Sequence, residues 1–238
     1  TFNVQSLKAH KEDLIIDYLL PEIKIMAFTE TWLNNNERVD LNGYRCVTQF
    51  KRENVRAGGV GLYEKKECML FSTPHILMEF DKKLTKLDRT TATSEHCGDI
   101  CAVESTINGQ RTLIVTVYVS PNSTMEDIEC FFLTNLLMYT QKASEMFEQI
   151  RKKGYGQIPI ILSGDINLDL KKPESRQFIN FMRHTFELQL KTDPSISTTR
   201  GGSCIDAVFT RHVDRIDTAN YVSYFSYHKP LLSITSSN

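Results

Sequence analysis

The segment IPIILSGDINLDL, residues 158–170, constrains the fold more than any other part of the chain. Its first half is a short apolar run that ends at Ser163–Gly164, and such a run predicts a buried strand. Asp165, Asn167 and Asp169 then occupy alternate positions. Two interpretations are open: a turn in which Asp and Asn bond to their own backbone, or polar groups gathered at the rim of a sheet for chemistry.

The remainder of the chain alternates strand-like runs with amphipathic segments. Apolar spacing predicts helices over His10–Leu20, where Pro21 ends the helix, over 125–151 and around 174–184. No repeat, low-complexity tract or linker interrupts the 238 residues, of which 41% are hydrophobic. This predicts a single α/β domain over 1–238 with helices covering the sheet faces. The expected strands lie near 1–7, 23–33, 57–64, 100–106, 111–119, 158–163, 203–210, 219–224 and 231–235.

The formal net charge of −1 excludes a global attraction to nucleic acid, so DNA binding would depend on local basic patches. Three clusters of cations are candidates, and each is read more readily as a solvated face than as a binding stripe. The clusters are Lys51/Arg52/Arg56, Lys82/Lys83/Lys86/Arg89 and Arg151/Lys152/Lys153.

Six cysteines are scattered without the spacing of a disulfide framework. Only Cys97 and Cys101, preceded by His96, resemble a metal site, and they have no second ligand pair. Free thiols in a reducing compartment are the favoured interpretation. No apolar run approaches the ~20 residues of a membrane span, so no membrane association is expected. The chain opens inside the strand-like TFNV without Met, which suggests a domain from a longer chain with a truncated first strand.

Polar side chains recur where apolar strands end. Each has an ordinary explanation taken alone, since Asn and Asp cap turns and a tyrosine can be part of a core. If the strands lie side by side, their ends would form one acidic, amide-rich cleft suited to a hard cation with oxygen ligands. His228, followed by Pro230, stands beside another such strand end. The polar residues are Asn3, Glu30, Tyr118, Asn122, Asp165, Asn167 and Asp206.

Taken in order, these segments resemble the endonuclease/exonuclease/phosphatase family, and most closely the apurinic-type endonuclease domain of non-LTR (LINE-like) retrotransposons. The likeness covers almost the whole chain, and its strength comes from the order of the motifs. It implies a four-layer α/β sandwich of two packed mixed β-sheets flanked by helices. The motifs are NVQSL at 3–7, ETWL at 30–33, GYR…R…GGVGLY at 43–63, VTVYVSPN at 115–122, PIILSGDINLD at 159–169, TTRGGSCIDAVFT at 198–210 and SYHKPLL at 226–232.

The resemblance implies a role for each strand-end residue. Glu30, with Asn3 nearby, would hold Mg²⁺, or Mn²⁺ in its place. Asp165 would orient or deprotonate the attacking water, and Asn167 would help to position that water and the phosphate. A phosphodiester is protected by its own negative charge, so hydrolysis needs a cation, hydrogen-bond donors and a positioned nucleophile.

The same resemblance assigns the phosphate contacts. His228 would hydrogen-bond the scissile phosphate, and Asp206 would fix its tautomer and favour its cationic form. Tyr118 and Asn122 would contact phosphate oxygens, although Tyr118 stands one residue farther from Pro-Asn than the family tyrosine does. Further candidates for substrate contacts are Arg200, Ser203 and Tyr227.

One departure from the family pattern bears on activity: the family has Ser-Asp-His, whereas this chain has Ser226-Tyr227-His228. The first functional hypothesis is a Mg²⁺-dependent endonuclease that nicks double-stranded DNA, leaving a 3′-hydroxyl that primes copying of a mobile element. Reverse transcriptase or other transposon domains in the parent chain, and action in the nucleus, would follow from it. The alternatives are a small-molecule phosphoesterase of the same fold and an impaired DNA-binding module.

Overall fold

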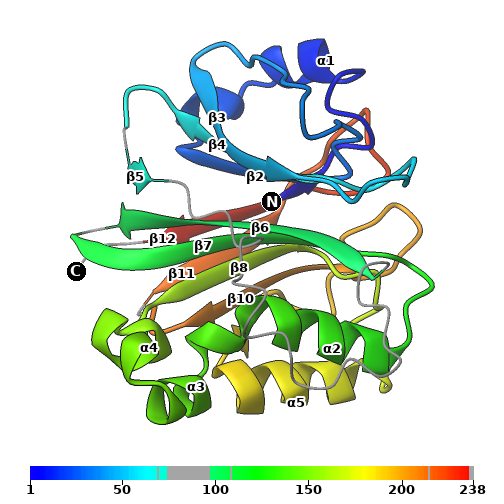
Figure 1. Cartoon of the computed structure of the whole chain (residues 1–238). Coiled ribbons are helices and arrows are strands. Elements are labelled where there is room, and N and C mark those ends of the chain that lie inside the picture. The colour runs from blue at the N-terminus through cyan, green and yellow to red at the C-terminus, as the bar shows by residue number, and fades with distance from the viewer. Residues whose placement is uncertain (69, 74–96, 108, 214, 236–238) are drawn as a thin grey trace.

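Two β-sheets pack face to face in the computed structural model, which describes residues 1–68, 70–73, 97–107, 109–213 and 215–235 (Figure 1). The first sheet has the order β1-β2-β4-β3. Strand β1 pairs with β2 in parallel, and the other two pairings are antiparallel. The bounds are β1 Phe2–Asn3, β2 Ile25–Thr29, β3 Tyr44–Phe50 and β4 Val60–Lys65.

The second sheet has the order β5-β6-β7-β8-β10-β9. Its only parallel pairing among the described residues joins β7 to β8, and the chain between these two strands crosses over the sheet as helices. The bounds are β5 Phe71–Thr73, β6 Gly98–Ile107, β7 Gln110–Val119, β8 Ile160–Asp165, β9 Gln189–Leu190 and β10 Asp206–Arg211.

A C-terminal hairpin continues the first sheet. Strands β11 (Ile216–Asn220) and β12 (Leu231–Thr235) pair with each other. Leu231 and Thr1 exchange two backbone hydrogen bonds of 2.9 and 2.7 Å, which place β12 beside the start of β1. The loop between β11 and β12 therefore returns next to the end of β1, and this loop carries His228.

Side-chain alternation along β7 divides the core into two layers. Leu113, Val115 and Val117 face the helices, whereas Ile114 and Tyr118 face the first sheet. Strands buried on both faces account for the unbroken apolar runs in the sequence. Helices cover the outer face of the second sheet, and a thinner layer of α1 and loops covers the first (Figure 1). The four-layer α/β sandwich with two mixed sheets is thus confirmed.

Two helix predictions are wrong in extent. The segment 125–151 is not one helix, because Thr140 and Phe147 adopt extended backbone conformations and begin new helices. The hydroxyl of Thr140 accepts a hydrogen bond from Ala143 N, which caps the second of these helices. The observed elements are α2 Met125–Leu136, η3 Leu137–Tyr139, α3 Gln141–Met146, α4 Glu148–Lys153 and η4 Tyr155–Gln157.

The first predicted helix is also shorter than expected. α1 spans Lys11–Ile15, and η1 (Leu20–Glu22) follows it. The carboxylate of Asp17 accepts a hydrogen bond from Leu19 N at 2.9 Å, a local bond that competes with helix continuation. By contrast, α5 (Ser175–Phe186) forms close to the predicted 174–184. No helix among the described residues is long and apolar enough to cross a membrane.

The six cysteines are free thiols, as expected, and Cys97 and Cys101 are buried. The group of metal-binding residue types found in the described part of the chain contains neither of them, which leaves the zinc interpretation without support. His96 lies outside the described residues, as do Lys82, Lys83, Lys86 and Arg89.

Candidate active site

Strand register brings four polar residues into one row across the second sheet. Asp99 on β6 pairs with Tyr118 on β7, Tyr118 pairs with Asp165 on β8, and Asp165 pairs with Asp206 on β10. Directly paired residues project from the same face of a sheet. Because Tyr118 packs in the layer between the sheets, the row faces the first sheet at the rim where β7 and β8 end.

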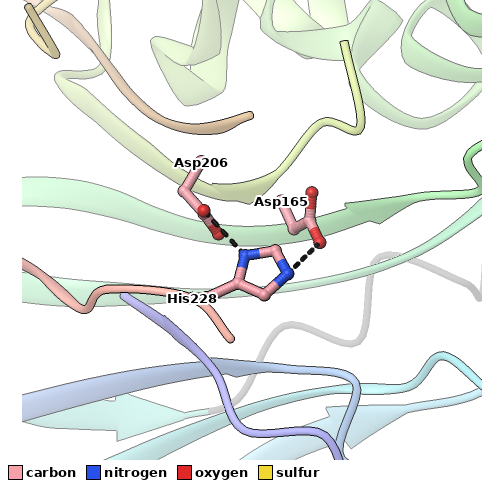
Figure 2. A group of neighbouring side chains, drawn as sticks. All are labelled: Asp165, Asp206 and His228. Atoms are coloured by element: carbon pink, nitrogen blue, oxygen red, sulfur yellow. Dashed lines mark hydrogen bonds and ion pairs between the residues drawn. The ribbon is translucent and has the colours of Figure 1, made fainter. Parts of the chain in front are cut away.

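An imidazole lies between the two aspartates of this row. His228 Nδ1 is 2.8 Å from Asp206 Oδ2, and His228 Nε2 is 3.8 Å from Asp165 Oδ2 (Figure 2). The three residues are 6%, 3% and 1% exposed for His228, Asp206 and Asp165, so the cluster is desolvated as well as close. Residues 165, 206 and 228 therefore converge as the sequence patterns predict.

The end of β1 completes this cluster from the other sheet. Asn3 Nδ2 donates to Asp165 Oδ2 at 2.8 Å, and Asn167 N donates to Asp165 Oδ1 at 3.0 Å, so both carboxylate oxygens are held. Ser226 Oγ donates to Asn3 O at 2.7 Å and accepts from His228 N at 3.1 Å. The serine thereby couples the position of the histidine to that of the asparagine.

Burial and neighbouring charge perturb the acid–base groups. Burial raises the pKa of Asp165 well above its ordinary value, and repulsion from Asp206 raises it further. Burial acts to lower the pKa of His228, but the hydrogen bond and charge of Asp206, followed by Asp165, outweigh it, so the pKa is raised. The arrangement therefore favours a cationic imidazole beside Asp206 and a carboxyl group at Asp165 that can accept a proton near neutral pH.

Glu30 projects from an irregular part of the first sheet. It lies between the Thr29–Val60 pair and the hydrogen bond from Thr31 N to Gly59 O, and its φ of 51° is left-handed. An extra residue of this kind acts as a β-bulge, which redirects a side chain at a strand end. Non-glycine residues with positive φ gather at the strand ends near the site, as strained positions do at functional sites; they are Gln5, Ser6, Glu30, Trp32 and Asn167.

The donor set fits a hard divalent cation. Among the described residues, the ligand atoms of Asp165, Asp206 and His228 lie within 4.8 Å of one another. Glu30 is outside that group but adjoins it, because burial and then the Glu30 carboxylate raise the pKa of Tyr118. The Asn3 carbonyl oxygen accepts one bond, from Gln5 N at 3.2 Å, and an amide oxygen has two lone pairs. Several buried carboxylates with amide oxygens nearby are the ligands Mg²⁺ and Mn²⁺ prefer.

Other predicted residues take different positions. Asn167 Nδ2 donates to Val119 O at 2.8 Å, so its amide nitrogen holds the end of β7. Asn122 is exposed in the turn after β7. The Ser203 hydroxyl lies 2.7 Å from that of Thr199, inside the 197–204 turn. Asp169 caps this region by accepting from Cys204 N at 3.0 Å.

Tyr227 and Arg200 border the site on the same turn. Tyr227 is 46% exposed and its ring meets that of His228 edge-on at 5.9 Å between centroids. A Cβ atom on Gly201 would lie 1.8 Å from the Tyr227 hydroxyl, so the phenol rests directly on this glycine. Arg200 Nη2 donates to Ser223 O at 2.9 Å, which orients its exposed guanidinium over the same loop.

The first basic cluster is not the solvated or DNA-facing surface that the sequence suggested. Lys51 is only 6% exposed and donates to Arg56 O at 3.2 Å. Arg52 is bonded to Asp99, with Nε 3.0 Å from Oδ1. Both cations are used inside the fold, and Arg56 is the exposed member of the cluster. The third cluster, Arg151/Lys152/Lys153, lies exposed on α4.

Asp99 and Ser226 are the residues near the site to which sequence reasoning gave no role. Asp99 is fully buried and precedes the apolar run ICAV, so a carboxylate at the start of a buried strand was the available signal. Ser226 stood within the SYHKPLL motif, but its contact with Asn3 joins residues 223 positions apart.

Searches by sequence identify no relative: no family model matches, and no curated protein matches significantly. Solved structures do match. The endonuclease domain of TRAS1, a telomere-specific non-LTR retrotransposon, aligns with a TM-score of 0.62 at 15% identity, over 98% of this chain and 94% of that one. The human Nocturnin catalytic domain with bound sulfate anion aligns at 0.59 and 14% identity, over 98% and 92%.

A third match is the 3′ phosphatase NExo from Neisseria bound to product DNA hairpin, with a TM-score of 0.55 at 15% identity, over 99% of this chain and 97% of that one. A further match is described as an endonuclease/exonuclease/phosphatase, from Bacteroides vulgatus. The likeness shows that this chain has the endonuclease/exonuclease/phosphatase fold. The structural neighbours include a retrotransposon endonuclease domain, as the sequence motifs suggested.

Proposed function

We propose that this chain, which has the fold of nucleases and phosphatases, is a divalent-cation-dependent endonuclease that nicks double-stranded DNA and leaves a 3′-hydroxyl and a 5′-phosphate. The observation that carries the proposal is the His228 imidazole held between the Asp206 and Asp165 carboxylates, with Asn3 on Asp165 from the opposite sheet. In a mobile element, acting in the nucleus and linked to a reverse transcriptase, the new 3′ end would prime copying.

Each residue of the cluster has a task in phosphodiester hydrolysis. Asp165 accepts the proton of the attacking water, and its raised pKa makes it a better base near neutral pH than an ordinary aspartate. His228, held cationic by Asp206, donates a hydrogen bond to a non-bridging phosphate oxygen and stabilises the charge that develops there. Asn3 and Asn167 N keep the Asp165 carboxylate in one orientation.

Glu30 and the Asn3 carbonyl oxygen would hold Mg²⁺ or Mn²⁺, which supplies Lewis-acid stabilisation of the phosphate when bound. Mg²⁺ retains several waters, so one carboxylate and one amide suffice for it without a dedicated cage. Tyr118 and Asn122 would contact phosphate oxygens from the end of β7. Exposed cations for the DNA backbone include Arg56 and Arg200.

Nicking of supercoiled plasmid tests this function. The wild-type chain should convert plasmid to open circles with Mg²⁺ and not with a chelator, and DNA ligase should reseal the nicks because it requires both predicted ends. His228→Gln should reduce the rate by about 10²-fold or more. His184→Gln is the matched control, because His184 is exposed in the last turn of α5. Absence of nicking with either Mg²⁺ or Mn²⁺ would refute the endonuclease proposal.

The same assay separates the alternatives. Release of inorganic phosphate from a small phosphoester, with intact plasmid, would indicate a phosphoesterase of this fold. Duplex binding that is unaffected by chelation, without any cleavage, would indicate a binding module in which Tyr227 has replaced a necessary carboxylate.

A further inference from the structure

A buried ion pair joins the two sheets next to the proposed site. Asp99 on β6 is fully buried, and Arg52 lies in the loop between β3 and β4. Asp99 Oδ1 accepts from Arg52 N at 2.7 Å and from Arg52 Nε at 3.0 Å, and Asp99 Oδ2 accepts from Gly59 N at 2.8 Å. One carboxylate therefore fixes both ends of the 52–59 loop to the second sheet.

The ion pair also packs against Tyr118. Asp99 and Tyr118 are direct partners across β6 and β7. A Cβ atom on Gly58 would lie 2.5 Å from Asp99 Oδ2 and 3.3 Å from Tyr118 Cε1, so the loop backbone passes between these side chains and admits only glycine there. Replacement of the Asp99 carboxylate would thus disturb the surroundings of the Tyr118 ring.

The fixed loop in turn supports the backbone around Glu30. Gly59 O accepts from Thr31 N at 3.1 Å, and Gly58 O accepts from Trp32 N at 3.0 Å. These bonds lie immediately after the bulge at Glu30, whose left-handed φ needs support from its surroundings. The contacts run without a gap from Asp99 through Gly58–Gly59 to the residues that follow Glu30.

We propose that Asp99 and Arg52 are positioning residues, which set the orientation of Glu30 and Tyr118 and thereby the affinity of the site for a divalent cation. The proposal rests on the proposed function for the role of Glu30. Neither side chain touches the Asp165–Asp206–His228 cluster through the hydrogen bonds described above, so the pair acts through the backbone of the first sheet. Removing a group that orients a metal ligand costs about 10- to 100-fold in metal affinity or activity.

The chain contains a natural reporter for this test. Trp32 is its single tryptophan, two residues after Glu30, 43% exposed and bonded to Gly58 through its backbone. Its fluorescence therefore reports on the supported segment, and paramagnetic Mn²⁺ bound at Glu30 should quench it. Mn²⁺ titration of purified protein without DNA gives a binding midpoint that does not depend on cleavage.

Asp99→Asn should shift the Trp32 emission and raise the Mn²⁺ midpoint about tenfold or more. Glu104→Gln is the matched control: Glu104 pairs with Arg111 across the same two strands, at 2.7 Å between Oε1 and Nη2, toward their opposite ends. The control should leave both readouts at the wild-type value. Arg52→Lys keeps the charge and the backbone bond but not the guanidinium geometry, and it replaces Asp99→Asn if that variant fails to fold.

The outcomes distinguish this inference from the proposed function. If folded Asp99→Asn, or Arg52→Lys in its place, binds Mn²⁺ with the wild-type midpoint and shows unchanged Trp32 emission, the positioning role is wrong, even if plasmid is nicked. If the wild-type chain binds no Mn²⁺, the inference is likewise overturned. If the midpoint shifts as expected while the wild-type chain nicks no DNA, the positioning role stands and the endonuclease proposal fails.

Discussion

Asp206→Asn removes the negative charge that faces His228 and keeps a side chain of nearly the same size. The Asp206–His228 bond is 2.8 Å long and buried, and its removal acts against the protonated imidazole. A hydrogen bond to a charged group contributes about 1.5–3 kcal/mol, which corresponds to about a 10- to 150-fold loss of rate if the cation is needed in the transition state. Loss of this support should lower the pKa of His228, since Asp206 is the main group that raises it.

The assay is kcat/KM for plasmid nicking as a function of pH. A cationic His228 is present below its pKa, so the alkaline limb of the wild-type profile reports its loss, and Asp206→Asn should move that limb to lower pH. Both raised pKa values, that of His228 and that of Asp165, mean that the folded state binds more protons than the unfolded state. The free energy of unfolding should therefore fall as pH rises from about 6.5, and the fall should be shallower in the variant.

A variant profile with an unchanged alkaline limb would show that Asp206 does not maintain the charge of His228. A limb that moved to higher pH would contradict the sign of the argument. Denaturant unfolding at each pH serves as the control for loss of structure.

Three further predictions concern residues around the site and in the core. Arg211→Met should lower the free energy of unfolding by about 3 kcal/mol or more in urea, because the buried guanidinium satisfies the carbonyls of Tyr139, Tyr155, Ile158 and Phe186; a loss below about 1 kcal/mol would contradict this. Ser226→Ala leaves the His228 amide and the Asn3 carbonyl unpaired and should cost about 1–3 kcal/mol in the same assay, so an unchanged midpoint would refute it. Tyr227→Asp restores the carboxylate of the family motif and should nick plasmid about tenfold faster than Tyr227→Ala, whereas a slower rate would contradict it.

The sequence was sufficient for the sheets and for the main cluster because both depend on local patterns. Apolar runs that end in polar residues located β2, β7, β8 and β10, and the motif order supplied the fold. Asp165, Asp206 and His228 could be selected because each follows or begins a strand of this kind. Their contact distances depend on strand register, which the motifs did not specify.

What could not be predicted rests on contacts between distant segments. Arg52 was expected on a basic surface because its buried partner, Asp99, is 47 residues away. The break at Thr140 was missed because the apolar spacing continues through it, although the hydroxyl caps a new helix. The packing of Tyr227 on Gly201 likewise follows from the path of two loops.

The most direct test of the central claim is the nicking rate of Asp165→Asn, His228→Gln and the double variant. If the two residues serve one phosphodiester, the double variant should be no slower than the slower single variant by more than a few-fold. Losses that multiply in the double variant, or single variants that retain the wild-type rate, would contradict a common site.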